Sequence, residues 1–251
     1  MQPSHLQILR PATECDCDFQ RRLTMGGILR LVQEISTLHS EGLGATPLIH
    51  EKLHTAFLLA KVSVLAQQPI RSNEMVTLDT YPAAPVRAVY HRYTTLRRAD
   101  GSLAAAVDAR WVLVDTETRR ILRRPPEGLG FSFDGAAIAA EQDFAFPKPT
   151  ELRSLGAETA GYSRCDQNRH LNNTRYADIV CDHLPPEALE QDLLRRLVIL
   201  YHRELPMGDS MDLLGGSPEA DGFYFCGKHG EESCFEAYAS FAPVTIPEPR
   251  L

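Results

Sequence analysis

The feature that most constrains the fold of this chain is an internal repeat. The segment CDFQRRLT at residues 17–24 aligns without a gap to CDQNRHLN at residues 165–172. The Cys, Asp, Arg and Leu positions are identical, and each segment comes directly before a stretch with the residue spacing of a helix. Because repeated units show matched motifs in matched structural contexts, we interpret the 251-residue chain as two copies of one unit.

Each copy has the pattern of a helix followed by a meander of strands. Apolar residues at three- and four-residue spacing predict the first helix over 25–43, and 171–184 and 187–194 can form helices in the second copy. No helical stretch separates consecutive strands, which disfavours a doubly wound parallel sheet and favours an α+β fold. The predicted strands are 55–65, 75–81, 86–98 and 103–114 in the first copy, and 197–205, 210–214, 223–228 and 234–241 in the second.

A stretch rich in Pro and Gly separates the two copies. It contains Pro125-Pro126, Pro147 and Pro149, with glycines at 128, 130 and 135. Such residues punctuate regular structure. We therefore expect an N-terminal domain over 1–125, a linker over 126–150 and a C-terminal domain over 151–251.

Composition and charge exclude several classes of protein. The net charge of -7 does not suit a general nucleic-acid binder, which needs a basic surface. No apolar run is long enough to cross a bilayer, so membrane insertion is not expected, and residues 1–5 show no export signal. Six scattered cysteines predict reduced thiols and a cytoplasmic location rather than a disulfide framework. Cys15 and Cys17 are spaced too closely for a zinc knuckle, so no metal site is predicted.

The second copy holds polar residues that the first lacks. Asp166, Asn168 and His170 alternate, so in an extended segment their side chains would emerge on one side. Histidine is the commonest general base near neutral pH, and an Asn beside a helix N-terminus can donate to a developing oxyanion. A polar loop that only caps a helix is the alternative. The His and the paired Asn172-Asn173 exceed what a cap needs, which favours hydrolysis of an activated acyl group.

Three motifs resemble those of one enzyme family, the acyl-[acyl-carrier-protein] thioesterases, whose members contain two hot-dog folds. The segment DQNRHLNNTRY at 166–176 is similar to the family's signature before its second long helix. YHRE at 201–204 resembles the family's strand motif that ends in a glutamate. WVLVD at 111–115 with TRR at 118–120 resembles the end of the family's first sheet. The resemblance spans nearly the whole chain.

The resemblance implies two fused hot-dog domains, each a long helix packed on a mainly antiparallel sheet. It implies hydrolysis of fatty acyl-carrier-protein thioesters without a cofactor, with Asp166, Asn168, His170 and Glu204 as catalytic residues. Glu204 and His170 would activate or position water, and Asn168 would hold the thioester carbonyl. Asp166 would orient the network or attack as a nucleophile, and both roles stay open. Leu205 replaces a cysteine of some plant members, which leaves Cys165 as a weak candidate thiol.

In the first copy the corresponding site has lost its chemistry, because Gln20 and Arg22 replace Asn and His. We also interpret Gln67 as standing where Glu204 stands in the second copy. The first domain is therefore expected to bind the acyl chain through its helix, although Met25, Ile28, Leu29 and Val32 are equally explained as core. Seven arginines are candidates for docking the acidic carrier protein: Arg119, Arg120, Arg123, Arg124, Arg195, Arg196 and Arg203.

Two other functions remain open from the sequence. An acyl-CoA thioesterase would share much of the Asp-x-Asn pattern, and a non-catalytic acyl-binding or regulatory protein would need neither His170 nor Glu204. The second alternative expects the polar residues to have decayed in both copies, whereas only the first copy has lost them. Acyl length and a homodimeric state are not determined by the sequence.

Overall fold

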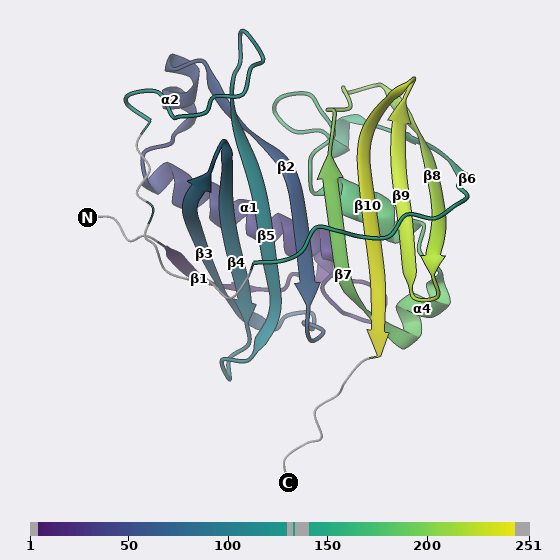
Figure 1. Ribbon diagram of the computed structural model, residues 1–251. Helices are drawn as coiled ribbons and strands as arrows, with labels where there is room; N and C mark the ends of the chain where they lie inside the picture. Colours follow the sequence, from purple (N-terminus) through teal and green to yellow (C-terminus); the bar gives the residue numbers. More distant parts are fainter. Residues whose placement is uncertain (1–4, 130–132, 134–140, 244–251) are drawn as a thin grey trace.

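The computed structural model describes residues 5–129, 133 and 141–243, and its strands form one antiparallel sheet (Figure 1). The order across the sheet is β1-β3-β4-β5-β2-β7-β10-β9-β8-β6, so each copy contributes five adjacent strands. The strands of the first copy are β1 (Leu6–Pro11), β2 (Thr55–Ala66), β3 (Met75–Val86), β4 (Val89–Arg97) and β5 (Leu103–Asp115). Those of the second are β6 (Arg153–Thr159), β7 (Asp192–Tyr201), β8 (Ser210–Glu219), β9 (Gly222–His229) and β10 (Glu232–Pro243).

The helices lie on one face of this sheet, behind it in Figure 1. A 3-10 turn precedes the first helix of each copy, at Glu14–Asp16 and Tyr162–Arg164. The helices are α1 (Met25–Gly42), α2 (Pro47–Lys52), α3 (Arg175–Asp182) and α4 (Pro186–Gln191). The predicted α+β class is therefore confirmed, with one long and one short helix in the first copy and two short ones in the second.

Local sequence signals explain where α1 begins and ends. The Thr24 side chain accepts the Gly27 amide at 3.0 Å, which satisfies one of the free amides of the first turn. The helix ends at Gly42, and Gly44, just beyond the Leu43 cap, has a φ of 97° that suits a residue without a side chain. Between these ends, the apolar side of the helix is buried on the sheet, with Ile35 fully inaccessible. The predicted helix over 25–43 is confirmed.

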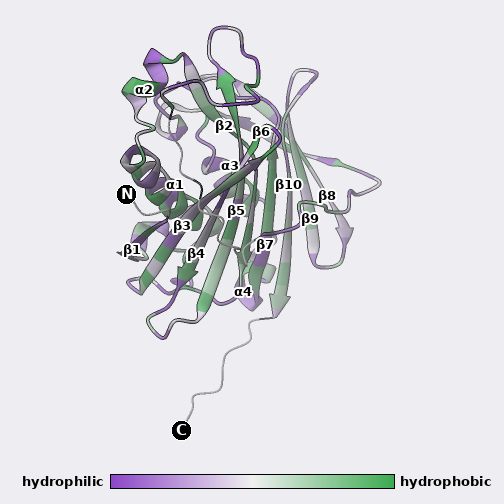
Figure 2. Cartoon of the chain, turned by 60° about the vertical axis from the view of Figure 1, so that its left-hand side comes forward, coloured by the Kyte–Doolittle hydropathy of each residue, from purple (hydrophilic) through white to green (hydrophobic). Residues whose placement is uncertain are grey.

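The two copies join through the pairing of β2 with β7. This antiparallel pair runs from Lys61↔Leu200 to Leu65↔Arg196 and makes the sheet continuous. One hydrophobic core extends beneath both halves. Figure 2 shows the hydrophobic residues along central strands such as β5, β7 and β10 and many hydrophilic ones in the loops. Both copies therefore share one core.

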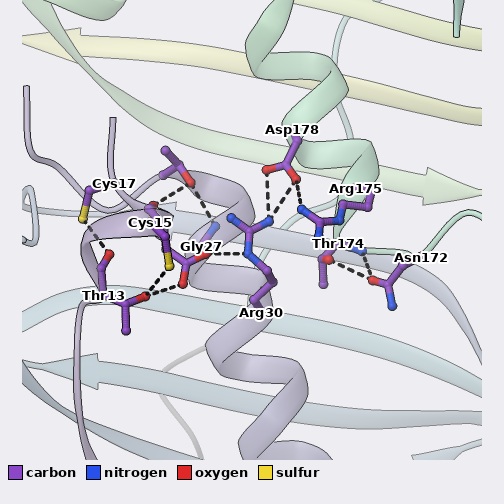
Figure 3. Close-up of polar contacts among 11 residues, drawn as sticks. Thr13, Cys15, Cys17, Gly27, Arg30, Asn172, Thr174, Arg175 and Asp178 are labelled. Carbon is purple, nitrogen blue, oxygen red and sulfur yellow. Dashed lines mark hydrogen bonds and ion pairs between the residues drawn. The ribbon is translucent and has the colours of Figure 1, made fainter. Parts of the chain in front are cut away.

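The helices of the two copies also touch, where α1 crosses α3 (Figure 3). A Cβ added at Gly26 would lie 1.8 Å from an Asp178 carboxylate oxygen, so any other residue there would require the Asp178 side chain to move. Next to it, Arg30 of α1 bonds Asp16 of its own copy at 2.6 Å and Asp178 of the other at 2.9 Å. Arg175 also reaches Asp178, at 3.1 Å. These ion pairs fix the two helices against each other.

The linker crosses the face of the sheet opposite the helices, in front of β7 and β10 in Figure 1. Arg196 donates to the carbonyls of Asp143 and Ala145, and the Phe146 ring stacks on Tyr238 with centroids 5.7 Å apart. Lys148 pairs with Glu236 at 2.8 Å. Of the predicted linker, residues 130–132 and 134–140 lie outside the described part of the chain.

Most predicted strands are present, with shifted ends. The structure adds β1, β6 and α2, which were not predicted, and it shortens the expected helix over 171–184 to α3. The predicted helix over 187–194 ends at Gln191 because β7 already begins at Asp192. The predicted strand over 197–205 ends at Tyr201, which places Glu204 in the turn that follows.

Candidate active site

The loop that carries three of the predicted catalytic residues is a tight turn. The Asp166 carboxylate accepts the amides of Asn168 at 2.8 Å and of His170 at 3.4 Å. The Asp166 amide in turn donates to the His170 carbonyl at 2.9 Å. Arg169 adopts φ 63°, the left-handed conformation that closes the turn. The expectation of an extended segment with alternating side chains is therefore wrong, because the Asp166 side chain folds the backbone around itself.

The first copy contains the same loop. The Asp18 carboxylate accepts the amides of Gln20 at 2.9 Å and Arg22 at 2.8 Å, and Arg21 has φ 60°. The residue after each loop donates to the turn behind it: Leu23 to the carbonyl of Ile70, Leu171 to that of Leu205. The repeat predicted from the sequence is thus present in the structure.

This correspondence corrects one residue assignment. Since Ile70 matches Leu205, the residue that matches Glu204 is Pro69 and not Gln67. The first copy therefore lacks the carboxylate, the His and the Asn together.

In the first copy, Arg22 and Gln20 attach the loop to the other half of the molecule. The Arg22 guanidinium donates to Asp18 at 3.0 Å and to the carbonyls of Leu189 and of Asp192, the latter at 3.1 Å. Gln20 donates to the Glu190 carbonyl at 2.7 Å. The Leu189 and Glu190 carbonyls belong to the last turn of α4, where cationic donors stabilise a helix, and Asp192 is the first residue of β7. Arg22, which stands where His170 stands in the second copy, therefore links the two copies.

In the second copy, His170 faces Glu204. His170 Nδ1 lies 3.6 Å from Glu204 Oε1, and both side chains are about one-third exposed or less. The contact arises because the His170 backbone bridges Pro206 and the Leu171 amide donates to the Leu205 carbonyl at 2.9 Å. The other carboxylate oxygen of Glu204 accepts from Arg119 at 2.9 Å. Thus His170 and Glu204, predicted from two distant motifs, are neighbours.

Asn168 reaches a cavity of about 470 Å³ that extends into the first copy. One wall is the C-terminal half of α1, and the opposite wall carries aromatic residues from three strands. Thr116, in the turn that leads to Arg119, also lines the cavity. The aromatic residues of the cavity wall are Phe57, Tyr90, Trp111 and Phe133. The cavity thus combines these aromatic side chains with polar ones such as Gln33, Ser36 and Glu41 of α1.

Three basic residues that were not predicted also line this cavity, namely His50, His91 and Arg92. Arg92 is buried under α1, where it donates to Ser40 at 2.9 Å, and burial lowers its pKa to about 10. Burial also lowers the pKa of His50. No sequence signal identified these residues or the aromatic ones, because separate elements contribute them and no motif contains them.

The proposed acyl-binding residues of α1 do not line this cavity. Met25 and Ile28 line a different space of about 310 Å³ beside Arg22 and α4. Leu29 and Val32 are buried in the common core. The alternative that these residues are core thus describes Leu29 and Val32 correctly.

The remaining candidates have structural partners. The Cys165 thiol donates to the Ala160 carbonyl at 3.5 Å and faces the groove between α1 and the second 3-10 turn rather than the Asn168 cavity. Tyr176 packs edge-on against Tyr201 and Phe235, and burial raises the pKa of both phenols. Within 5–129, 133 and 141–243, no cluster of His, Cys, Asp and Glu is placed to hold a metal ion. None of the helices described is long and apolar enough to cross a membrane.

Solved structures share this architecture along nearly the whole chain. An acyl-ACP thioesterase from Bacteroides thetaiotaomicron superposes with a TM-score of 0.86 at 20% identity, covering 95% of this chain and 98% of that one. A 12:0-ACP thioesterase from Umbellularia californica gives a TM-score of 0.81 at 17% identity, covering 97% and 99%. The predicted fold of two fused hot-dog domains is confirmed.

Sequence comparisons give the family. Curated relatives include a palmitoyl-acyl carrier protein thioesterase of Cuphea hookeriana, 23% identical over 76% of this chain and 48% of its own length. An oleoyl-acyl carrier protein thioesterase of Arabidopsis thaliana is 25% identical over 76% and 57%. The chain spans about half the length of these relatives. Residues 12–129 match the acyl-ACP thioesterase N-terminal domain, and residues 159–234 match the C-terminal domain. The chain belongs to the acyl-ACP thioesterase family.

Proposed function

We propose that this protein hydrolyses fatty acyl-carrier-protein thioesters to free fatty acid and carrier protein. The observation that carries the proposal is the junction at residues 166–170. There Asn168 reaches an aromatic-walled cavity, and His170 in the same loop faces Glu204. An apolar tail in the cavity would place its thioester beside the polar loop. Family membership supports the same reaction.

The contacts support a division of labour within the second copy. Glu204 Oε1 lies 3.6 Å from His170 Nδ1, so its negative charge favours a proton on that nitrogen and leaves Nε2 to take a proton from water. The water oxygen attacks the thioester carbon, and the Asn168 amide donates to the oxyanion that develops. The proton then passes from His170 to the departing thiolate. His170 and Glu204 therefore act when the proton is taken from water and returned to the thiolate, and Asn168 acts when the oxyanion develops.

Asp166 orients the loop in this scheme and does not attack the substrate. One of its carboxylate oxygens accepts two backbone amides of its own turn. Asp18 makes the same two bonds in the first copy, where no His or Asn accompanies it. An aspartate retained in both copies for the same turn needs no catalytic explanation. We therefore favour direct attack by water over an anhydride intermediate.

The two copies would divide substrate recognition from cleavage. We place the boundary within 126–150, with the first copy supplying most of the cavity and the second supplying the reactive loop. Arg120, Arg123 and Arg124 follow the Arg119 turn, are exposed, and have no ion pair within the described ranges, so they can meet an acidic carrier. The other candidate arginines Arg195, Arg196 and Arg203 are already engaged by Gln67, the linker and Glu232.

Steady-state hydrolysis of carrier-linked and CoA-linked esters of the same acyl group tests this function. We expect a higher kcat/KM for the carrier-linked ester, and loss of both activities in His170→Ala. Equal or higher kcat/KM for the CoA ester would instead identify an acyl-CoA thioesterase. Binding of acyl carrier without turnover would identify a non-catalytic acyl-binding protein.

A further inference from the structure

Arg119 occupies a rigid turn of the first copy. After β5 ends, the Asp115 carboxylate accepts the Thr118 amide at 2.7 Å and the Thr118 hydroxyl at 2.9 Å. The Arg119 amide donates to the Asp115 carbonyl at 2.9 Å, and the Asp115 amide donates to the Arg120 carbonyl at 2.9 Å. Arg119 itself takes φ 59°. The turn therefore fixes the point from which the Arg119 side chain leaves the backbone.

From this turn, the guanidinium reaches across to the second copy. Arg119 Nη2 lies 2.9 Å from Glu204 Oε2, while Glu204 Oε1 lies 3.6 Å from His170 Nδ1. The two oxygens of one carboxylate thus face two different partners, one from each copy. Rotating the carboxylate to free either oxygen would break one of these contacts.

The ion pair between Arg119 and Glu204 is too exposed to contribute much to the folding stability of the protein. The Arg119 side chain is 68% exposed and that of Glu204 is 33% exposed. Exposed pairs contribute between nothing and about 1 kcal/mol to folding. The engagement also argues against Arg119 as a carrier-docking residue, because its guanidinium is already committed to Glu204.

We propose that Arg119 is a positioning residue, supplied by the first copy, that holds the Glu204 carboxylate in the orientation in which it faces His170. The inference rests on the proposed function and extends it. It means that the reactive group of the second copy is complete only when the first copy is folded beside it. A small displacement of an orienting group can cost a large factor in turnover.

Arg119→Ala, Arg119→Lys and the control Arg87→Ala test this role. Arg87 is also exposed, has φ 60°, and makes no side-chain hydrogen bond or ion pair with any described residue. We expect Arg119→Ala to lower kcat about tenfold on both a carrier-linked ester and a short carrier-free thioester. KM should change less than about twofold. Arg119→Lys should recover part of kcat, and Arg87→Ala should match the wild type.

A double-mutant cycle separates positioning from any other contribution. In a Glu204→Ala background, Arg119→Ala should change kcat by less than about twofold, because the group it positions is gone. A further tenfold loss in that background would overturn the inference. An effect confined to KM for the carrier-linked ester would also overturn it, in favour of carrier docking.

The outcome for the wild type separates this inference from the proposed function. If the wild type hydrolyses thioesters and Arg119→Ala is equally fast, only the role of Arg119 is refuted. If the wild type hydrolyses no thioester, both fail. Melting curves of all variants, expected within about 2 °C of the wild type for an exposed pair, verify that the variants are folded.

Discussion

Arg22→Ala should destabilise the protein and leave the chemistry intact. The Arg22 side chain is 9% exposed and its partner Asp18 is 21% exposed. Removing it leaves the carboxylate without its cation and the carbonyls of Leu189 and Asp192 without the Arg22 donors. Breaking a buried pair costs about 3–5 kcal/mol. Since Asp18 keeps two amide donors and some water contact, we expect the lower end, about 3 kcal/mol.

At this chain length each kcal/mol lowers Tm by about 2–4 °C, so the Arg22→Ala melting point should fall by about 6–12 °C. Circular dichroism melting measures this, and kcat at 25 °C on a short acyl thioester should stay within about threefold of the wild type. Arg21→Ala is the matched control, because Arg21 lies in the same turn but is exposed. An unchanged Tm, or a kcat as low as that of His170→Ala, would refute the interpretation of Arg22 as an inter-copy clamp.

Three further predictions concern the helix contact, the carrier and the cavity. Gly26→Ala should cost about 1–3 kcal/mol in urea unfolding because the new methyl overlaps a carboxylate of α3, whereas Gly42→Ala, with open space around it, should cost nothing. Reversing Arg123 and Arg124 to Glu should lower kcat/KM for carrier-linked substrate at low salt only; equal loss on small thioesters would contradict docking. Phe57→Ala should shift preference towards longer acyl chains, by several-fold per carbon at about 0.8 kcal/mol per methylene, as turnover across chain lengths would reveal.

The repeat and the meander of strands were predictable because both rest on local patterns. Periodic apolar residues gave α1, and alternating or apolar runs gave most strands within a few residues. The strands β1 and β6 escaped detection because each lies at an edge of the sheet, where half-exposed residues carry no apolar run. The short α2 depends on a Thr46 cap and Pro47 rather than on a periodic face.

Residues of the site were predictable only where a sequence motif contains them. His170 and Glu204 stood out because each belongs to a family motif, and the fold brings them within 3.6 Å. The cavity wall was not predictable, since Phe57, Tyr90 and Trp111 come from three strands and read as ordinary core residues. Nor could the sequence show that Arg22 reaches across to the end of α4.

The measurement that tests the central claim most directly is the kcat of His170→Ala and Glu204→Ala on an acyl-carrier-protein thioester. If these two residues activate water together, each substitution should lower kcat at least about a hundredfold, the usual contribution of a positioned acid or base. The double variant should then be little worse than either single one, since the pair acts as a unit. Single variants that retain kcat within about threefold of the wild type would contradict the assignment of catalysis to the second copy.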